Sequence, residues 1–340
     1  MICLGFDTSN YTTSVASFDG AVGDNASRLL PVKPGELGLR QSEALFSHIK
    51  RLPELSDRLF ARLDPSQLRA VGVSTRPRAV EGSYMPCFLA GECQARVLAS
   101  ALHVPLYEFS HQQGHIAAVL WSAGRLDLLG SEFLAWHLSG GTTELLHVRT
   151  TAAGDIACEK IGGTTDISAG QLIDRTGQLL GLDFPAGRAI DALAEQGSGI
   201  KDQGSGIKDC RDGTLPSAVH DSAAAHTGAP RDRAFFRVKV NGCAFSLSGV
   251  ENQVRAFRER GGSEAETAYF ALRSVVEAVK KATSNAEKDR KLPVLFSGGV
   301  ASNSMLRRRM PEAIFGAPQY STDNAMGIAV LTWLKLNAKE

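Results

Sequence analysis

The sequence predicts an α/β protein whose two domains face each other across a cleft. The chain has 340 residues, enough for about two domains by the usual relation between length and domain number. Apolar stretches of strand length alternate with longer segments of helical spacing in both halves. An apolar segment, a polar turn and a second apolar segment occur in succession near residue 2 and again near residue 133. This repetition indicates a coarse internal duplication, with each half presenting a hairpin tip to the cleft.

The composition is that of an ordinary folded protein. Apolar residues make up 43% of the chain and charged residues 21%, and the formal net charge is +1. This charge balance does not indicate a nucleic-acid binder over the whole chain, although it leaves RNA binding open. Two short basic segments, Arg76-Pro77-Arg78 and Arg307-Arg308-Arg309, are candidate phosphate contacts. Such short runs are more often a solvated surface.

The cysteines and the N-terminal residues favour a cytoplasmic protein. None of the six cysteines forms a C-x-x-C pair, so neither a zinc ribbon nor a redox motif is predicted. The first residues lack the charged start and apolar core of a signal peptide, and no apolar run reaches transmembrane length. We therefore expect reduced thiols, no membrane association and a cytoplasmic location.

The first half is predicted to begin with a hairpin and to continue with alternating helices and strands. Within residues 2–18, two apolar segments flank a polar turn at 7–13, which is the pattern of paired strands. Residues 39–63 have apolar residues near helical spacing, among them Phe46 and Ile49. The remaining elements are a buried strand at 70–74, a helix at 88–102, a strand at 105–109 and a helix from 111 to about 124.

The second half opens on a similar hairpin, with strands at 133–138 and 144–148 joined by Ser139-Gly140-Gly141-Thr142-Thr143. The later elements are helices at 167–182 and 264–288, a strand at 294–296, a helix opened by Asn303, a last strand at 314–320 and a C-terminal helix. Residues 196–232 are rich in Gly, Ser and Asp and contain a tandem repeat at 196–209. Two copies are too few for a solenoid, so we expect a flexible surface insertion.

His111 and His115 are the clearest candidate metal ligands. At the predicted start of a helix, their i, i+4 spacing places both imidazoles on one face. Two histidines make only half of a catalytic metal site, and two ordinary helix histidines are the alternative interpretation. A metalloprotease is disfavoured, because Gln112 and Gln113 cannot act as the general base that zincins carry beside the first histidine.

Three glycine-containing turns favour a phosphate-bearing ligand held between the two halves. They lie at 139–143, 185–187 and 297–300. Backbone N–H groups approach an anion closely at such turns, and a following helix favours negative charge there. None of the turns is a Walker loop or a dinucleotide-binding G-x-G-x-x-G. Turns in both halves predict a nucleotide cleft between two actin-like domains of the RNase H-like type, as in hexokinase and heat-shock-protein ATPases. The expected domains are residues 1–124 with the C-terminal helix 324–340, and residues 131–323.

Ordered motifs extend along nearly the whole chain. They are Gly5-Phe6-Asp7-Thr8-Ser9, His111-x-x-Gly114-His115, Ser139-Gly140-Gly141-Thr142-Thr143, Asp174 with Gly181-Leu182, Pro185-Ala186-Gly187, Ser248-Gly249, Gly298-Gly299-Val300-Ala301-Ser302-Asn303 and Thr322-Asp323-Asn324. In this order they resemble the TsaD-type tRNA threonylcarbamoyl transferases, also called the glycoprotease family.

The resemblance implies binding sites for two ligands. His111, His115 and Asp323 would bind one divalent metal ion, iron or zinc, which suits such a ligand set. An adenylate or ATP-like ligand would be held by residues of the second half, namely His137, Leu138, Ser139, Gly140, Gly141, Asp174, Gly187, Asp191 and Asn303. The first hairpin tip is a further candidate phosphate contact, through Thr8, Ser9 and Asn10.

The resemblance also implies a reaction and partners. Threonylcarbamoyl-adenylate would give its threonylcarbamoyl group to N6 of the adenosine next to the tRNA anticodon, in a metal-dependent step without a covalent nucleophile. The implied partners are tRNA, a smaller paralogue and an ATPase.

Several positions depart from the pattern of this family. Asn10-Tyr11-Thr12 stands where Cys-Asp-Glu is usual, Arg76-Pro77-Arg78 replaces a Gly-Pro-Gly turn, and Gln113 replaces a glutamate. The ligand-holding positions are retained better than the acidic residues around them. The alternative hypothesis is therefore a diverged family member that binds metal and adenine nucleotide and uses another acceptor or hydrolyses ATP.

Overall fold

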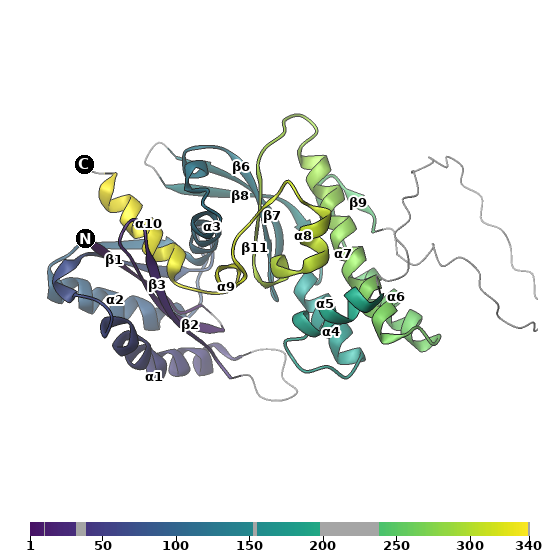
Figure 1. The fold of residues 1–340 in the computed structure, drawn as a ribbon, viewed down its shortest axis with the longest axis horizontal. Helices are drawn as coiled ribbons and strands as arrows, with labels where there is room; N and C mark the ends of the chain where they lie inside the picture. The colour runs from purple at the N-terminus through teal and green to yellow at the C-terminus, as the bar shows by residue number, and fades with distance from the viewer. Residues whose placement is uncertain (10, 32–38, 152–154, 198–237, 339–340) are drawn as a thin grey trace, which may run out of the picture.

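The computed structural model describes residues 1–9, 11–31, 39–151, 155–197 and 238–338. Within these residues the chain forms two β-sheets, one of five strands and one of seven, and helices pack on both (Figure 1). The two sheets confirm the prediction of two α/β units, because each has its own helices and its own apolar core.

The first sheet has the strand order β3-β2-β1-β4-β5. Its strands are β1 (Ile2–Asp7), β2 (Thr12–Phe18), β3 (Gly23–Leu29), β4 (Leu68–Arg76) and β5 (Leu106–Ser110). The first three pair antiparallel, β4 lies parallel to β1, and β5 lies parallel to β4. One face is covered by α1 (Gln41–Phe60) and α2 (Phe88–Leu102), and the other by α10 (Met326–Asn337).

A glycine in β1 lets α10 lie close on the first sheet. Leu4 and Phe6 belong to the core with α1 and α2, so Gly5 between them faces the opposite side. A Cβ at Gly5 would lie 2.5 Å from the backbone nitrogen of Ala329 in α10. This close packing brings the residues just before α10, including Asp323, to the end of β1.

The second sheet has the order β12-β11-β6-β7-β8-β10-β9. Its strands are β6 (Phe133–Leu138), β7 (Thr143–Thr150), β8 (Ile156–Thr164), β9 (Val240–Asn241), β10 (Ala244–Phe245), β11 (Val294–Ser297) and β12 (Ile314–Phe315). The helices of this half are α4 (Ala169–Leu179), α5 (Gly187–Gly197), α6 (Ser248–Glu259), α7 (Glu264–Ala286), α8 (Ser304–Arg309) and α9 (Pro318–Ser321). Trp136 is fully buried in this core and donates its indole N–H to Thr283 of α7 at 2.9 Å.

The two sheets share one plan. Five strands of the second sheet follow the order β8-β7-β6-β11-β12, which repeats the order β3-β2-β1-β4-β5 of the first. In both, an antiparallel hairpin is followed on its other side by a parallel strand. The duplication read from the sequence is therefore present in the strand topology.

The histidine-bearing helix lies between the two sheets. α3 (His111–Ser122) is buried over Gln112 to Leu120 and packs on β11 of the second sheet and on α10 of the first half. Figure 1 shows α3 and α9 in the middle of the molecule. A helix buried on all sides has no polar face, which is why its apolar residues show little helical periodicity.

The apolar residues of the predicted helix at 39–63 lie on two faces of α1. Phe46 is 63% exposed and Ile49 is 55% exposed, whereas Leu52, Leu55 and Leu59 form the side that packs on the sheet. The sequence contains apolar residues on two faces of this helix, and its periodicity alone does not separate them.

The last predicted strand and the start of the insertion also differ. The strand expected at 314–320 ends after Phe315, because Pro318 opens the short helix α9. The insertion expected at 196–232 begins later, since Gln196 and Gly197 complete α5. The sequence analysis did not predict α5, β3 or β8. The rest of that segment lies outside the described residues. No helix in the described part of the chain is both long and apolar enough to cross a bilayer.

Candidate metal and nucleotide site

The start of α3 is fixed by a reciprocal cap that involves Gln113. The Gln113 side chain accepts a 2.7 Å hydrogen bond from the Ser110 backbone N–H, and the Ser110 hydroxyl accepts one from the Gln113 N–H. The Gln113 amide also donates to the carbonyl of Ile156 in β8 at 2.8 Å. Gln113 thus anchors the first turn of the helix to the second sheet. This contact requires a side-chain donor, which an ionised glutamate would lack.

His111, His115 and Asp323 converge at one point. Nε2 of His111 lies 3.5 Å from Oδ1 of Asp323, and Nε2 of His115 lies 3.3 Å from the same oxygen. The candidate ligand atoms of the three residues all lie within 4.8 Å of one another. Asp323 reaches this point because α10 is seated on β1, while the two histidines come from successive turns of α3.

Asp7 completes the cluster from the end of β1. Its Oδ2 lies 2.8 Å from Nδ1 of His111, and its Oδ1 accepts the backbone N–H of Ser9 at 3.0 Å. In a neutral His111, an acceptor at Nδ1 keeps the proton on that nitrogen, so Nε2 is the atom whose lone pair can face an ion. Sequence reasoning placed Asp7 in the hairpin but not in the site, although an acid ending a strand ahead of Thr8-Ser9 was the available signal.

The geometry of these residues fits a metal ion. Four tetrahedral ligands at about 2.1 Å from an ion lie about 3.4 Å from each other, and the two nitrogen-to-oxygen separations are 3.5 and 3.3 Å. His115 is 4% exposed, and its Nε2 makes no hydrogen bond among the described residues although Oδ1 of Asp323 lies 3.3 Å away. A buried nitrogen without a partner is costly, and an ion at this point would satisfy it.

The charges of the cluster depend on each other. Burial opposes the charged form of His111, but Asp7 and Asp323 outweigh it and raise the pKa of His111 to about 10. Burial and the neighbouring His111 charge lower the pKa of His115. Burial would raise the pKa values of Asp7 and Asp323, but their histidine partners lower both. Without an ion, a protonated His111 holds the two carboxylates together, so an ion that binds here must displace that proton.

His137 lies next to the cluster. Its ring centroid is 4.7 Å from that of His115, and its Nδ1 lies 3.2 Å from the Ser297 hydroxyl. Because that hydroxyl donates to the carbonyl of Trp136 at 3.0 Å, His137 must donate from Nδ1. Its Nε2 is therefore unprotonated, in agreement with burial holding the pKa of His137 well below its usual value.

The glycine turn after His137 and Leu138 packs on the start of α4. The carbonyl of Gly140 accepts a 2.6 Å hydrogen bond from the Ser168 hydroxyl, and the Ser139 hydroxyl accepts the N–H of Thr142 at 3.1 Å. A Cβ at Gly140 or Gly141 would meet nothing within 4 Å. The turn is thus held in place from one side and open on the other.

The remaining predicted nucleotide residues form two contacts elsewhere in the second half. Asp191 accepts hydrogen bonds from the Asn303 amide at 2.7 Å and from the backbone N–H of Ser304 at 3.0 Å, and so fixes the start of α8. Asp174 accepts the N–H of Ala186, next to Gly187, at 2.9 Å, and burial raises its pKa.

The first hairpin tip has mainly internal contacts. The Thr8 hydroxyl donates to the carbonyl of Cys87 at 3.0 Å and accepts the N–H of Gly91 at 3.1 Å, which ties the tip to α2. The Ser9 hydroxyl is buried without a partner among the described residues. Asn10 lies outside the described residues.

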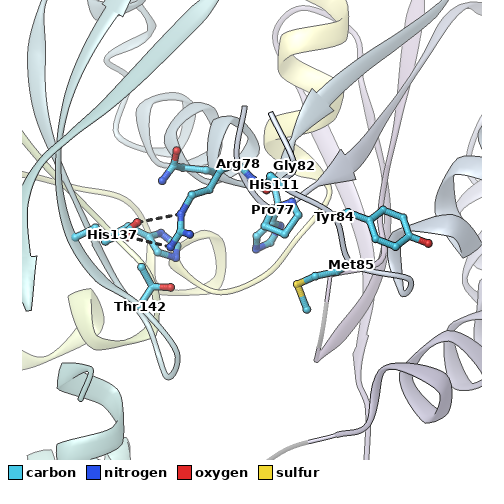
Figure 2. A pocket seen from close by; sticks show the side chains of 11 residues that line it. Pro77, Arg78, Gly82, Tyr84, Met85, His111, His137 and Thr142 are labelled. Carbon is cyan, nitrogen blue, oxygen red and sulfur yellow. Dashed lines mark hydrogen bonds and ion pairs between the residues drawn. The ribbon is translucent and has the colours of Figure 1, made fainter. Parts of the chain in front are cut away.

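A pocket of about 380 Å³ opens beside the cluster. It is lined by Pro77, Arg78, Gly82, Ser83, Tyr84, Met85, His111, Gln112, His137, Thr142 and Glu144. Figure 2 shows the Arg78 side chain extending toward His137, with Tyr84 and Met85 beyond His111 on the other side. The pocket thus lies between the loop after β4 and the hairpin of the second sheet.

Arginines of the basic segment at 307–309 make contacts within the protein. Arg307 donates to the carbonyls of Ala301 and Gly316 at 3.2 and 2.9 Å, and Arg308 pairs with Glu195 at 3.0 Å. These contacts make the segment a poor candidate for phosphate binding. Arg78 in the other basic segment, by contrast, lines the pocket.

Solved structures share this fold. A full-length HypF structure in the phosphate- and nucleotide-bound form matches 99% of the chain with a TM-score of 0.57 at 13% identity, and HypF from T. kodakarensis matches 99% with a TM-score of 0.54 at 14% identity. The chain corresponds to 55% and 48% of those two proteins. At such low identity the likeness shows the fold alone.

Two duplicated sheets around a buried histidine and aspartate cluster define a protein of the actin-like ATPase fold. Residues 38–330 match the family model described as TsaD, tRNA N6-adenosine threonylcarbamoyltransferase. Proteins with that name from Chlorobium phaeobacteroides and Carboxydothermus hydrogenoformans are each 30% identical to the chain, over 99% and 96% of it and 92% and 90% of their own lengths. The chain belongs to the TsaD family, which confirms the resemblance of its motifs.

Proposed function

We propose that this protein transfers the threonylcarbamoyl group from threonylcarbamoyl-adenylate to N6 of the adenosine next to the tRNA anticodon. The observation that supports it most is the convergence of His111, His115 and Asp323 beside a pocket lined by His137 and Thr142, in a chain of the TsaD family. Histidine and carboxylate ligands around a small opening leave room for a substrate oxygen.

His111, His115 and Asp323 would hold one divalent ion, iron or zinc, through two Nε2 atoms and a carboxylate. When bound, the ion supplies Lewis acidity toward a charged oxygen of the acyl donor. Asp7 orients His111 through the 2.8 Å contact at Nδ1 and keeps the proton on that nitrogen, so Nε2 is the nitrogen that gives up its proton to the ion.

The glycine turn is the proposed seat of the adenylate. Backbone at residues 139–141 is open on one side, and the α4 contacts hold it rigid. Asp174, Gly187, Asp191 and Asn303 would complete the adenylate site from the second half. Thr8 and Ser9, at the tip of the first hairpin, would contact a phosphate of this ligand from the first half.

The proposed reaction balances without a covalent intermediate. The N6 amine attacks the carbamoyl carbon, a C–N bond forms, and the bond from that carbon to the phosphate oxygen breaks, releasing AMP. One amine proton passes to solvent. The residues of this chain position donor and acceptor, which accounts for a large part of such a rate enhancement.

The same proposal implies an acceptor, partner proteins, domain bounds and a cellular location. The acceptor would be tRNA, with a smaller paralogue and an ATPase as partner proteins. The domains would be residues 1–124 with 324–340 and residues 131–323, a division supported by the two sheets. A cytoplasmic location is supported by free thiols at every described cysteine, which are Cys3, Cys87, Cys93, Cys158 and Cys243.

The decisive experiment is a transfer assay with purified protein, threonylcarbamoyl-adenylate and unmodified tRNA, with and without the partner proteins, read by mass spectrometry of the nucleosides. Metal content is measured on the same sample. His115→Ala should lose both the metal and transfer, whereas His147→Ala, a histidine of β7 paired with Glu132 at 3.5 Å, should keep both.

Unmodified tRNA in every arm would contradict the proposal. AMP release from the donor that does not depend on tRNA would instead favour the alternative of another acceptor, and turnover of added ATP would favour an ATP-hydrolysing activity.

A further inference from the structure

Arg78 and Glu144 form an ion pair that joins the two halves across the pocket. The guanidinium donates from Nε and Nη2 to the two carboxylate oxygens at 3.2 and 2.9 Å. Arg78 belongs to the loop after β4, and Glu144 belongs to β7 of the second sheet. This two-point geometry is the one in which arginine recognises a carboxylate.

The loop that carries Arg78 is tied to the histidine helix. The carbonyl of Pro77 accepts the N–H of Gln112 at 3.1 Å, directly after His111. The N–H of Arg78 donates to the Ser83 hydroxyl at 3.0 Å, which closes the loop on itself. The position of the guanidinium is therefore set relative to His111, and Arg78 is the one arginine or lysine among the described residues that line the pocket.

Arg78 and Glu144 differ in how buried they are and in whether another charged partner remains if the pair opens. The Glu144 side chain is only 8% exposed, but a second cation, Lys160, lies 3.0 Å from its Oε1. The Arg78 side chain is 45% exposed. Arg78 can therefore leave without stranding a buried carboxylate, since Lys160 still compensates Glu144.

We propose that Arg78 exchanges Glu144 for the carboxylate of the acyl donor, and so selects donors that carry an amino-acid carboxylate. This inference rests on the proposed function. Thr142 lines the pocket and directly follows Gly141 in the glycine turn proposed for the adenylate. A donor held at that turn extends its acyl end along the pocket, where Pro77, Tyr84 and Met85 supply apolar surface and Arg78 supplies the charge.

The pocket also explains one departure from the family pattern. Arg76-Pro77-Arg78 stands where a Gly-Pro-Gly turn is usual, and the second arginine of this segment is the one that lines the pocket. The arginine contact to the donor carboxylate would then be particular to this chain, while the donor is the one the family uses.

The test is titration calorimetry of the full-length, metal-loaded protein with two small probes. N-carbamoyl-L-threonine carries the carboxylate, and its carboxamide differs from it only in lacking that charge. The wild-type protein should bind the acid about tenfold more tightly than the amide, as expected for a charged two-point contact that is partly exposed. Arg78→Gln should remove this preference, and Arg78→Lys should restore part of it.

Two further variants separate partner exchange from a structural role. Arg76→Gln removes the same charge at the end of β4, two residues before Arg78, but Arg76 does not line the pocket, so the preference for the acid should persist. Glu144→Gln removes the competing carboxylate, so it should tighten binding of the acid. A pair that only links the two halves would make Arg78→Gln and Glu144→Gln weaken binding alike, with parallel losses in melting temperature.

A wild-type protein that binds the acid no more tightly than the amide overturns the proposal, as does a Glu144→Gln protein that binds the acid no more tightly than wild type. An equal loss of AMP affinity in Arg78→Gln assigns the arginine to the phosphate and also overturns it. A preference for the acid that depends on Arg78, without transfer to tRNA, would leave this inference standing and remove the proposed function. Transfer without that preference would do the reverse.

Discussion

Asp7 and His111 are 104 positions apart in the chain, yet Oδ2 of one lies 2.8 Å from Nδ1 of the other. The contact joins the end of β1 to the first residue of α3. It gives the proposed metal site a carboxylate that would orient a ligand without being one, and such partners change metal affinity when they are removed.

Asp7→Asn should lower metal affinity about 10- to 100-fold, because the amide can still accept a hydrogen bond but no longer carries the charge that orients His111. Competition with a chromophoric zinc chelator measures this. Asp19→Asn is the matched control, since that carboxylate accepts the N–H groups of Ala21 and Val22 in an exposed turn. Equal affinity of Asp7→Asn and wild type would show that Asp7 has no role in metal binding.

His48 should make the fold sensitive to acid. It is fully buried, its Nδ1 contacts the Thr13 hydroxyl at 2.8 Å, and burial lowers its pKa from 6.5 to about 4. Between these two pH values the unfolded chain binds a proton at this position and the folded protein does not, so stability falls as the pH falls. The loss across the window is about 3 kcal/mol.

The measurement is urea unfolding at pH 7 and at pH 4.5. His48→Gln removes the ionisation and should flatten the pH dependence. A variant at His48 with the full acid sensitivity of wild type would assign that sensitivity to other groups.

Gly5→Ala should destabilise the protein by about 3 kcal/mol, at the upper end of the usual cost of overpacking. The added Cβ would lie 2.5 Å from the Ala329 nitrogen and 2.7 Å from the Ala325 oxygen, and backbone atoms of α10 cannot rotate away. Gly130→Ala is the control, because a Cβ there meets nothing within 4 Å. Thermal unfolding compares the two. Because Asp323 lies just before α10, displacement of this helix should also weaken metal binding. Unchanged stability would argue against the close packing of α10 on β1.

Asp191→Asn should weaken AMP binding several-fold. One side-chain oxygen becomes an NH2 group that faces the donors of Asn303 and Ser304, so the start of α8 shifts at a cost of about 1–3 kcal/mol. Calorimetric titration with AMP measures the affinity. Asp127→Asn, which alters only an exposed pair with Arg125, should bind AMP like wild type. Normal AMP affinity in Asp191→Asn would remove Asp191 and its partner from the proposed adenylate site.

The sequence by itself determined the fold class, the family and most of the elements. Strands and helices with regular apolar spacing, such as α2 at Phe88–Leu102, are visible because the spacing repeats within one segment. The metal candidates were also visible, since His111 and His115 are four residues apart and Asp323 lies within the family motif Thr322-Asp323-Asn324. The buried face of α1 and the end of the last strand were not visible in the sequence. Local spacing does not state which face of a helix packs on a sheet, or how far a strand continues.

Only the tertiary structure decided which distant groups meet. The pairing of Asp7 with His111, of Asp191 with Asn303 and of Arg78 with Glu144 depends on how strands and helices from separate parts of the chain pack. The meaning of Gln113 was settled in the same way, since its amide both caps α3 and reaches Ile156. Residue type and spacing specify chemistry along one element, whereas a site built from several elements depends on the apolar packing that brings their ends together.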